Sequence, residues 1–112
     1  MKDLTFSQIV KLQKTYNVNG VQESINSGGC WKMEGSNGRF AMSCLESGAC
    51  MLPLQPRFDY YGNRVPSRDM LEKGTKGTFL NSSNFWNRVM DGNIEAIEWL
   101  EETFVRVEQQ QN

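Results

Sequence analysis

The chain has 112 residues, of which 38% are hydrophobic and 22% charged, and its formal net charge at pH 7 is −1. This length and balance predict a single globular domain over residues 1–108, followed by a disordered glutamine-rich tail at 109–112. Nonspecific nucleic-acid binding relies on many cations, so the near-neutral charge argues against nucleic acid as a partner.

Other features of the sequence limit the cellular compartment and the kinds of chemistry that we expect. No run approaches the roughly 18 consecutive apolar residues that span a bilayer, and the first ten residues lack a secretory signal pattern. Cysteine occurs three times, an odd number that disulfide-stapled secreted domains rarely show. We therefore expect a cytoplasmic protein without membrane contact. The chain has no histidine, which removes the commonest general base and the Ser–His and Cys–His nucleophile pairs.

The first third of the chain is predicted to be mostly helical. Thr5 is a suitable N-cap, and apolar residues follow it at helical spacing as far as Tyr16. A short second helix around residues 21–25 should end at the glycine pair 28–29. Residues 30–34 are predicted to form a short strand.

Residues 35–48 admit two interpretations. Ser36 can cap a helix over residues 38–47 that ends at Gly48, or the glycine-bearing loop at 35–38 can form a hairpin turn. We favour the helix, because AMSCLES contains good helix formers and no β-branched residue.

Short strands and then a broken helix are expected in the second half. Apolar and aromatic runs predict strands at residues 49–54, 58–61, 63–65 and 78–80. Helical periodicity returns after Ser82 or Ser83, either of which could be the N-cap, and it continues to about Val107. Asp91-Gly92-Asn93 should break this helix, with Asn93 capping its second part. The pattern predicts an α+β fold: a small, mostly antiparallel sheet within residues 49–80, packed by N-terminal and C-terminal helices.

The cysteines offer little support for a metal site or a nucleophile. Cys30, Cys44 and Cys50 lack the closely spaced pairs typical of zinc sites, and no histidine can supplement them. Cys30 follows two glycines, but no neighbouring residue in the sequence is an evident activator of its thiol. We expect buried, unreactive cysteines, no metal, no cofactor and no enzymatic activity.

The candidate binding residues lie mainly between residues 59 and 78. They combine aromatic faces with cations, a composition common at protein interfaces and at ligand sites: Tyr60, Tyr61, Arg64, Arg68 and Lys76. A scaffold role is equally open, because a strand through Tyr60 and Tyr61 would send one of the two rings into the core. The glycine-bearing turns at 35–39 and 74–78 have the composition of anion sites but not the spacing of a phosphate loop.

The C-terminal helical region carries a heptad-like row of apolar residues. The row comprises Trp86, Met90, Ile97, Leu100, Phe104 and Val107. We expect it to pack on the protein's own core, with a coiled coil as the alternative. Trp99 falls outside the row, among acidic residues, and suggests a second packing surface for a homodimer.

These features favour a noncatalytic intracellular protein-interaction module, such as a small regulator, an inhibitor or an accessory subunit of a larger assembly. Its partner would be another protein, with homo-oligomerisation through the C-terminal helix as a possibility. The alternative is a protein that binds a small phosphorylated ligand or a nucleotide. In that case Tyr60 or Tyr61 would stack on the ligand, and Arg39, Arg64, Arg68 or Lys76 would meet its charge.

Overall fold

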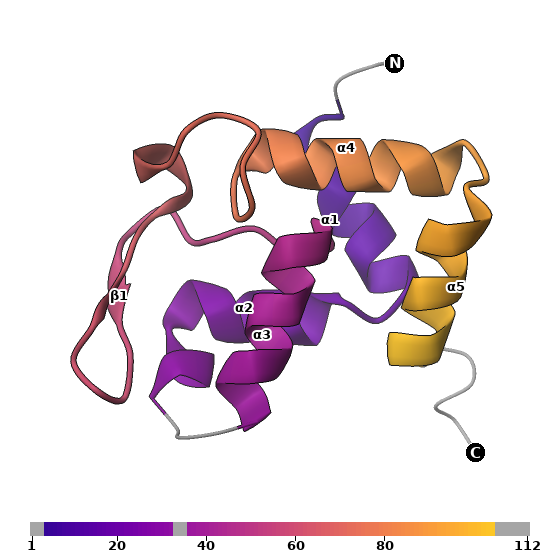
Figure 1. The fold of residues 1–112 in the computed structure, drawn as a ribbon. Coiled ribbons are helices and arrows are strands. Elements are labelled where there is room, and N and C mark those ends of the chain that lie inside the picture. Colours follow the sequence, from indigo (N-terminus) through magenta and orange to yellow (C-terminus); the bar gives the residue numbers. More distant parts are fainter. Residues whose placement is uncertain (1–3, 33–35, 105–112) are drawn as a thin grey trace.

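The computed structural model describes residues 4–32 and 36–104, and within them it contains five α-helices and one β-hairpin. In chain order the elements are α1 (Phe6–Thr15), α2 (Asn19–Ser27), the 3₁₀ turn η1 (Gly29–Trp31), α3 (Ser36–Ser47), β1 (Arg57–Phe58), β2 (Arg64–Val65), the 3₁₀ turn η2 (Arg68–Met70), α4 (Phe79–Met90) and α5 (Ile94–Thr103). The hairpin projects from the helical body on the side away from α5 (Figure 1). The predicted α+β class is confirmed.

The predicted helical signals of the first half are confirmed. Thr5 caps α1 through a capping box, in which its hydroxyl accepts from the Gln8 N–H and its own N–H donates to the Gln8 side chain. Gly28 ends α2 with a left-handed φ of +84°. The helical interpretation of residues 38–47 is also correct, since α3 covers them.

The strand predicted at residues 30–34 is wrong where it can be checked. After Gly28 the chain forms the 3₁₀ turn η1, in which the N–H groups of Trp31 and Lys32 bond to the carbonyls of Gly28 and Gly29. These two N–H groups are used within the turn and cannot bond to a neighbouring strand. Residues 33 and 34 lie outside the described part of the chain.

The sheet within residues 49–80 is a single antiparallel hairpin, with Arg57 opposite Val65 and Phe58 opposite Arg64. The strand predicted at 78–80 is wrong, because α4 begins at Phe79. Its N-cap is Thr78, whose hydroxyl accepts from Asn81 N at 3.2 Å. The suggested caps Ser82 and Ser83 are instead buried inside the helix.

The strand predicted at 49–54 is also absent, although this segment is mostly buried. Side chains, and not a neighbouring strand, provide hydrogen-bond partners for much of the backbone of this segment. The Ala49 carbonyl accepts from Gln13 Nε2 and Trp86 Nε1, at 2.9 and 3.2 Å. Gln22 bonds to both the N–H and the carbonyl of Met51, at 3.0 and 2.8 Å. The two glutamines also bond to each other, which fixes the segment against α1 and α2.

The C-terminal helical region breaks where the sequence predicts. Asn93 caps α5 by accepting from the Ala96 N–H, and Gly92 has a φ of +81°. The apolar row is split accordingly. Most of its described members pack in or against the core, but Met90 is 59% exposed. Val107 and the tail at 109–112 lie outside the described residues.

Candidate functional site

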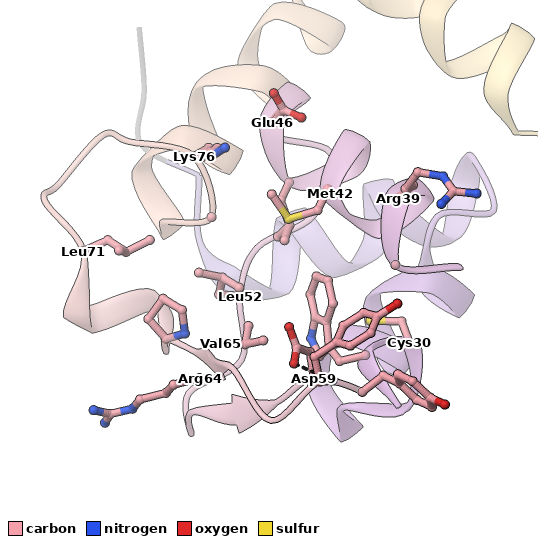
Figure 2. A pocket seen from close by; sticks show the side chains of 17 residues that line it. Cys30, Arg39, Met42, Glu46, Leu52, Asp59, Arg64, Val65, Leu71 and Lys76 are labelled. Atoms are coloured by element: carbon pink, nitrogen blue, oxygen red, sulfur yellow. Dashed lines mark hydrogen bonds between the residues drawn. The ribbon is translucent and has the colours of Figure 1, made fainter. Parts of the chain in front are cut away.

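The main pocket of the described structure is a groove of about 820 Å³. One wall is α3, a second is the hairpin and a third is the loop between η2 and α4 (Figure 2). The residues discussed below are Cys30, Trp31, Arg39, Met42, Leu45, Glu46, Leu52, Asp59, Tyr60, Tyr61, Arg64, Leu71, Lys76 and Gly77. We call this pocket the groove.

The floor of the groove is apolar and closely packed. Trp31, Leu45 and Leu52 are all buried. Gly77 brings the loop directly onto the floor: its carbonyl accepts from the Leu52 N–H at 2.9 Å. A Cβ at Gly77 would lie 2.7 Å from Leu52 Cδ1, and its φ is +89°. Glycine is therefore required for the loop to approach this closely.

The Trp31 side chain leaves a polar group unsatisfied. Its indole Nε1 is buried, and no hydrogen-bond partner for it occurs among the residues that the structure describes. A buried donor without an acceptor reduces stability by about 1–3 kcal/mol.

The tip of the hairpin is held by hydrogen bonds from Asp59 and displays two tyrosines. Asp59 Oδ1 accepts from the N–H groups of Tyr61 and Asn63, at 2.9 and 2.8 Å, and Gly62 takes a φ of +84° in the turn. Tyr60 and Tyr61 are 57% and 68% exposed, and their rings meet edge to face at 5.0 Å. The expectation that one ring enters the core is wrong, because both residues belong to the turn and not to a strand.

Cations surround the groove without converging on one point. Figure 2 shows Arg39, Arg64 and Lys76 at three separate edges, with the Arg64 guanidinium turned outward. Arg64 is exposed and contacts the Met70 sulfur at 3.7 Å. Glu46 on α3 adds a negative charge to the same rim. The groove therefore has a mixed, weakly cationic rim.

The six predicted binding residues do not all lie in the groove. Tyr60, Tyr61, Arg64 and Lys76 line the groove. Arg68 does not line it: its side chain is 8% exposed, and its Nε–H donates to the Leu52 carbonyl at 2.6 Å.

Trp99 also lies away from the groove, on α5. It is partly buried against the core, with its ring 5.9 Å from Phe85 and 6.1 Å from Phe104. Part of the Trp99 surface is thus covered by contacts within the chain, and the homodimer stays a prediction.

Sequence reasoning missed much of the groove. Trp31 and Leu52 come from distant segments that only tertiary packing brings together. The α3 wall did leave a signal: Arg39, Met42 and Glu46 are spaced three and four apart, so they share one helix face. The neighbouring inward face holds Ala41, Cys44 and Leu45, which are buried.

The thiols are poorly suited to chemistry at neutral pH. Burial raises the pKa of Cys30 from 9.0 to about 11, despite an opposing hydrogen bond from Ser24. Burial and then the neighbouring Cys44 raise the pKa of Cys50 well above its usual value. A protonated thiol is a weak nucleophile. Among the described residues, no three cysteine or carboxylate side chains are grouped closely enough to hold a metal ion.

Comparisons with protein-family models, with curated proteins and with solved structures gave no match for this chain. Within the described residues, no helix has the length and apolar character needed to cross a membrane.

Proposed function

We propose that the chain is a noncatalytic protein-interaction module and that an extended segment of its partner binds in the groove. The observation that carries this proposal is the combination of an apolar floor with two exposed tyrosines on a hydrogen-bonded turn. Aromatic residues in such positions supply large contact areas with little loss of side-chain freedom. A small regulator, an inhibitor or an accessory subunit would act through a surface of this kind.

The apolar part of the groove favours side chains over a compact ion. Met42 on α3 and Leu71 in the loop line the sides above the buried floor. Methionine adapts its shape to a partner more readily than branched side chains do. A bound segment would place one or two apolar side chains here.

The charges favour an extended occupant. A phosphate group binds best where several donors point to one place. Arg39, Arg64 and Lys76 instead occupy separate edges of the groove, and Glu46 is also on the rim (Figure 2). Charges in this arrangement can meet polar groups at several points along a peptide. We therefore prefer a protein partner to a small phosphorylated ligand or a nucleotide in the groove.

A library of displayed 12-residue peptides, selected against the full chain, tests this proposal. We expect selected peptides to lose about tenfold or more in affinity with Tyr60→Ser and with Arg64→Glu, because both substitutions alter the groove. Phe58→Ser is the matched control for the first: Phe58 is 63% exposed on the same hairpin but does not line the groove. Lys11→Glu, on exposed α1 surface, controls for charge.

Two results would contradict the proposal. One is selected peptides that bind all four variants as tightly as the unchanged chain. The other is a loss of binding with Phe58→Ser or Lys11→Glu that equals the loss with Tyr60→Ser. Either result would place the binding surface outside the groove.

A further inference from the structure

A second pocket, which shares only Leu71 with the lining of the groove, lies at the N-terminal end of α4. Its volume is about 460 Å³, and its lining includes Arg68, Asp69, Lys73, Phe79, Leu80 and Ser83. Figure 1 shows η2 and the loop that follows it beside this end of α4. We propose that this pocket, the α4 pocket, binds the phosphate group of a small phosphorylated organic molecule. This inference is independent of the peptide groove.

Arg68 provides the main reason for an anion. Its side chain is 8% exposed and lines the pocket, and its Nε–H bonds to the Leu52 carbonyl. The described residues supply no hydrogen-bond or ion-pair partner to the two terminal guanidinium nitrogens. The guanidinium carbon lies 5.7 Å from the centre of the Phe6 ring, which orients the group without neutralising it. A largely buried cation of this kind is stabilised by an anion that accepts from its free N–H groups.

The titration of Arg68 agrees with this picture. Burial lowers the pKa of its guanidinium below the usual value for arginine, and the neighbouring Asp69 only partly opposes that effect. Asp69 also lines the pocket, so its carboxylate is a repulsive contribution to anion binding. The remaining groups of the pocket outweigh this single negative charge.

The start of α4 supplies backbone donors to the same pocket. The Thr78 hydroxyl satisfies Asn81 N, and the Thr78 carbonyl accepts from Ser82 N. The first amides of the helix, those of Phe79 and Leu80, have no acceptor within the helix because of its geometry. The positive end of the helix dipole lies at the same place.

Two side chains complete the set of donors. Ser83 is 1% exposed and accepts from the Leu4 N–H at 3.2 Å, so its hydroxyl proton can point to an acceptor in the pocket. Lys73 is exposed at the edge and adds a second cation. Guanidinium, ammonium, hydroxyl and helix amides together match the several acceptor oxygens of a phosphate.

The pocket is larger than a phosphate ion needs, and part of its wall is apolar. Leu71, Phe79 and Leu80 contribute this surface. An organic group attached to the phosphate would cover it and gain the free energy of apolar burial. We therefore infer a phosphate ester as the ligand, and not inorganic phosphate alone.

Amide NMR of the full chain tests the inference, with sodium phosphate and phenyl phosphate as probes and sodium chloride holding the ionic strength constant. We expect saturable shifts of the Phe79 and Leu80 amides with both probes, and at least tenfold tighter binding of phenyl phosphate. Equal affinity for the two probes would overturn the assignment of an organic ligand. Shifts that do not saturate, or that sodium chloride reproduces, would overturn the site itself.

Substitutions identify which positive side chains contact the phosphate group of the probe. Lys73→Gln should weaken phenyl phosphate binding about three- to fivefold, in line with the modest value of an exposed charge pair. Lys76→Gln is the matched control, because Lys76 is in the same loop but lines the groove. Arg68→Lys should weaken binding more than Lys73→Gln does, since lysine cannot form the bidentate contact. An equal effect of Lys73→Gln and Lys76→Gln would show that only the general charge of the loop matters and would refute the site.

Discussion

Replacing Gln22 with leucine should reduce the stability of the protein by about 2–4 kcal/mol. Gln22 is 6% exposed and joins α2 to the buried segment that follows α3. Its carbonyl oxygen accepts from Met51 N at 3.0 Å, and its amide nitrogen donates to Met51 O at 2.8 Å. Leucine has a similar size but can make neither bond, so two buried backbone groups lose their partner.

The size of the expected stability loss follows from the N–H and the carbonyl of Met51. Each buried polar group left unsatisfied reduces stability by about 1–3 kcal/mol, and the apolar surface that leucine buries offsets part of that loss. Gln13 also loses its bond to Gln22, but it keeps the Ala49 carbonyl as an acceptor. The total therefore remains near the middle of the possible range.

Urea unfolding, followed by tryptophan fluorescence, measures this loss as a lower midpoint with an unchanged slope. Glu23→Leu is the matched control, since Glu23 is the next residue of α2 and is exposed. Its effect should lie within about 0.5 kcal/mol of zero. If Gln22→Leu changed the stability by no more than Glu23→Leu does, the side-chain bonds to Met51 would not be what holds this segment.

Four further outcomes are expected. Gly48→Ala should destabilise by about 3 kcal/mol or more, because a Cβ there would lie 2.7 Å from Phe85 Cβ and 2.8 Å from a backbone oxygen at a φ of +98°. Gly92→Ala has a similar φ of +81° but open space, so thermal unfolding should show a smaller loss of about 1 kcal/mol, and equal losses would contradict the steric argument. Thr78→Ala should reduce stability by about 1 kcal/mol through loss of the α4 cap, whereas an unchanged midpoint in urea would mean that the cap contributes nothing. Burial raises the pKa of Cys30 from 9.0 to about 11. The stability that the protonated Cys30 thiol contributes is therefore complete below pH 9 and declines between pH 9 and 11. The free energy of unfolding should fall less over that range in Cys30→Ala than in the unchanged chain.

Local signals in the sequence predicted the helices well. The Thr5 cap, the stop at Gly28 and the break before Asn93 depend on backbone geometry and on bonds between residues a few positions apart. Such signals can be read without knowing the rest of the fold. The start of α4 was missed because Thr78, Ser82 and Ser83 are all suitable N-caps by type, and local pattern does not distinguish them.

The sequence predicted more strands than the structure contains, for a different reason. An apolar run such as residues 49–54 needs partners for its backbone, and a neighbouring strand is the usual source. Here Gln13, Gln22 and Trp86 provide partners from distant helices. Composition does not reveal that polar side chains far away in the sequence will serve this role.

By itself the sequence determined the class of the fold and the helices with local caps. It also singled out Tyr60, Tyr61, Arg64 and Lys76 as candidate binding residues, and the tertiary structure places all four in the groove. Only the tertiary structure decided that Arg68 turns away to a second pocket and that Trp99 packs inside the chain. The physical reason is the range of the interactions. Turn geometry and caps act between neighbours, whereas the burial of a side chain depends on which distant segments pack around it.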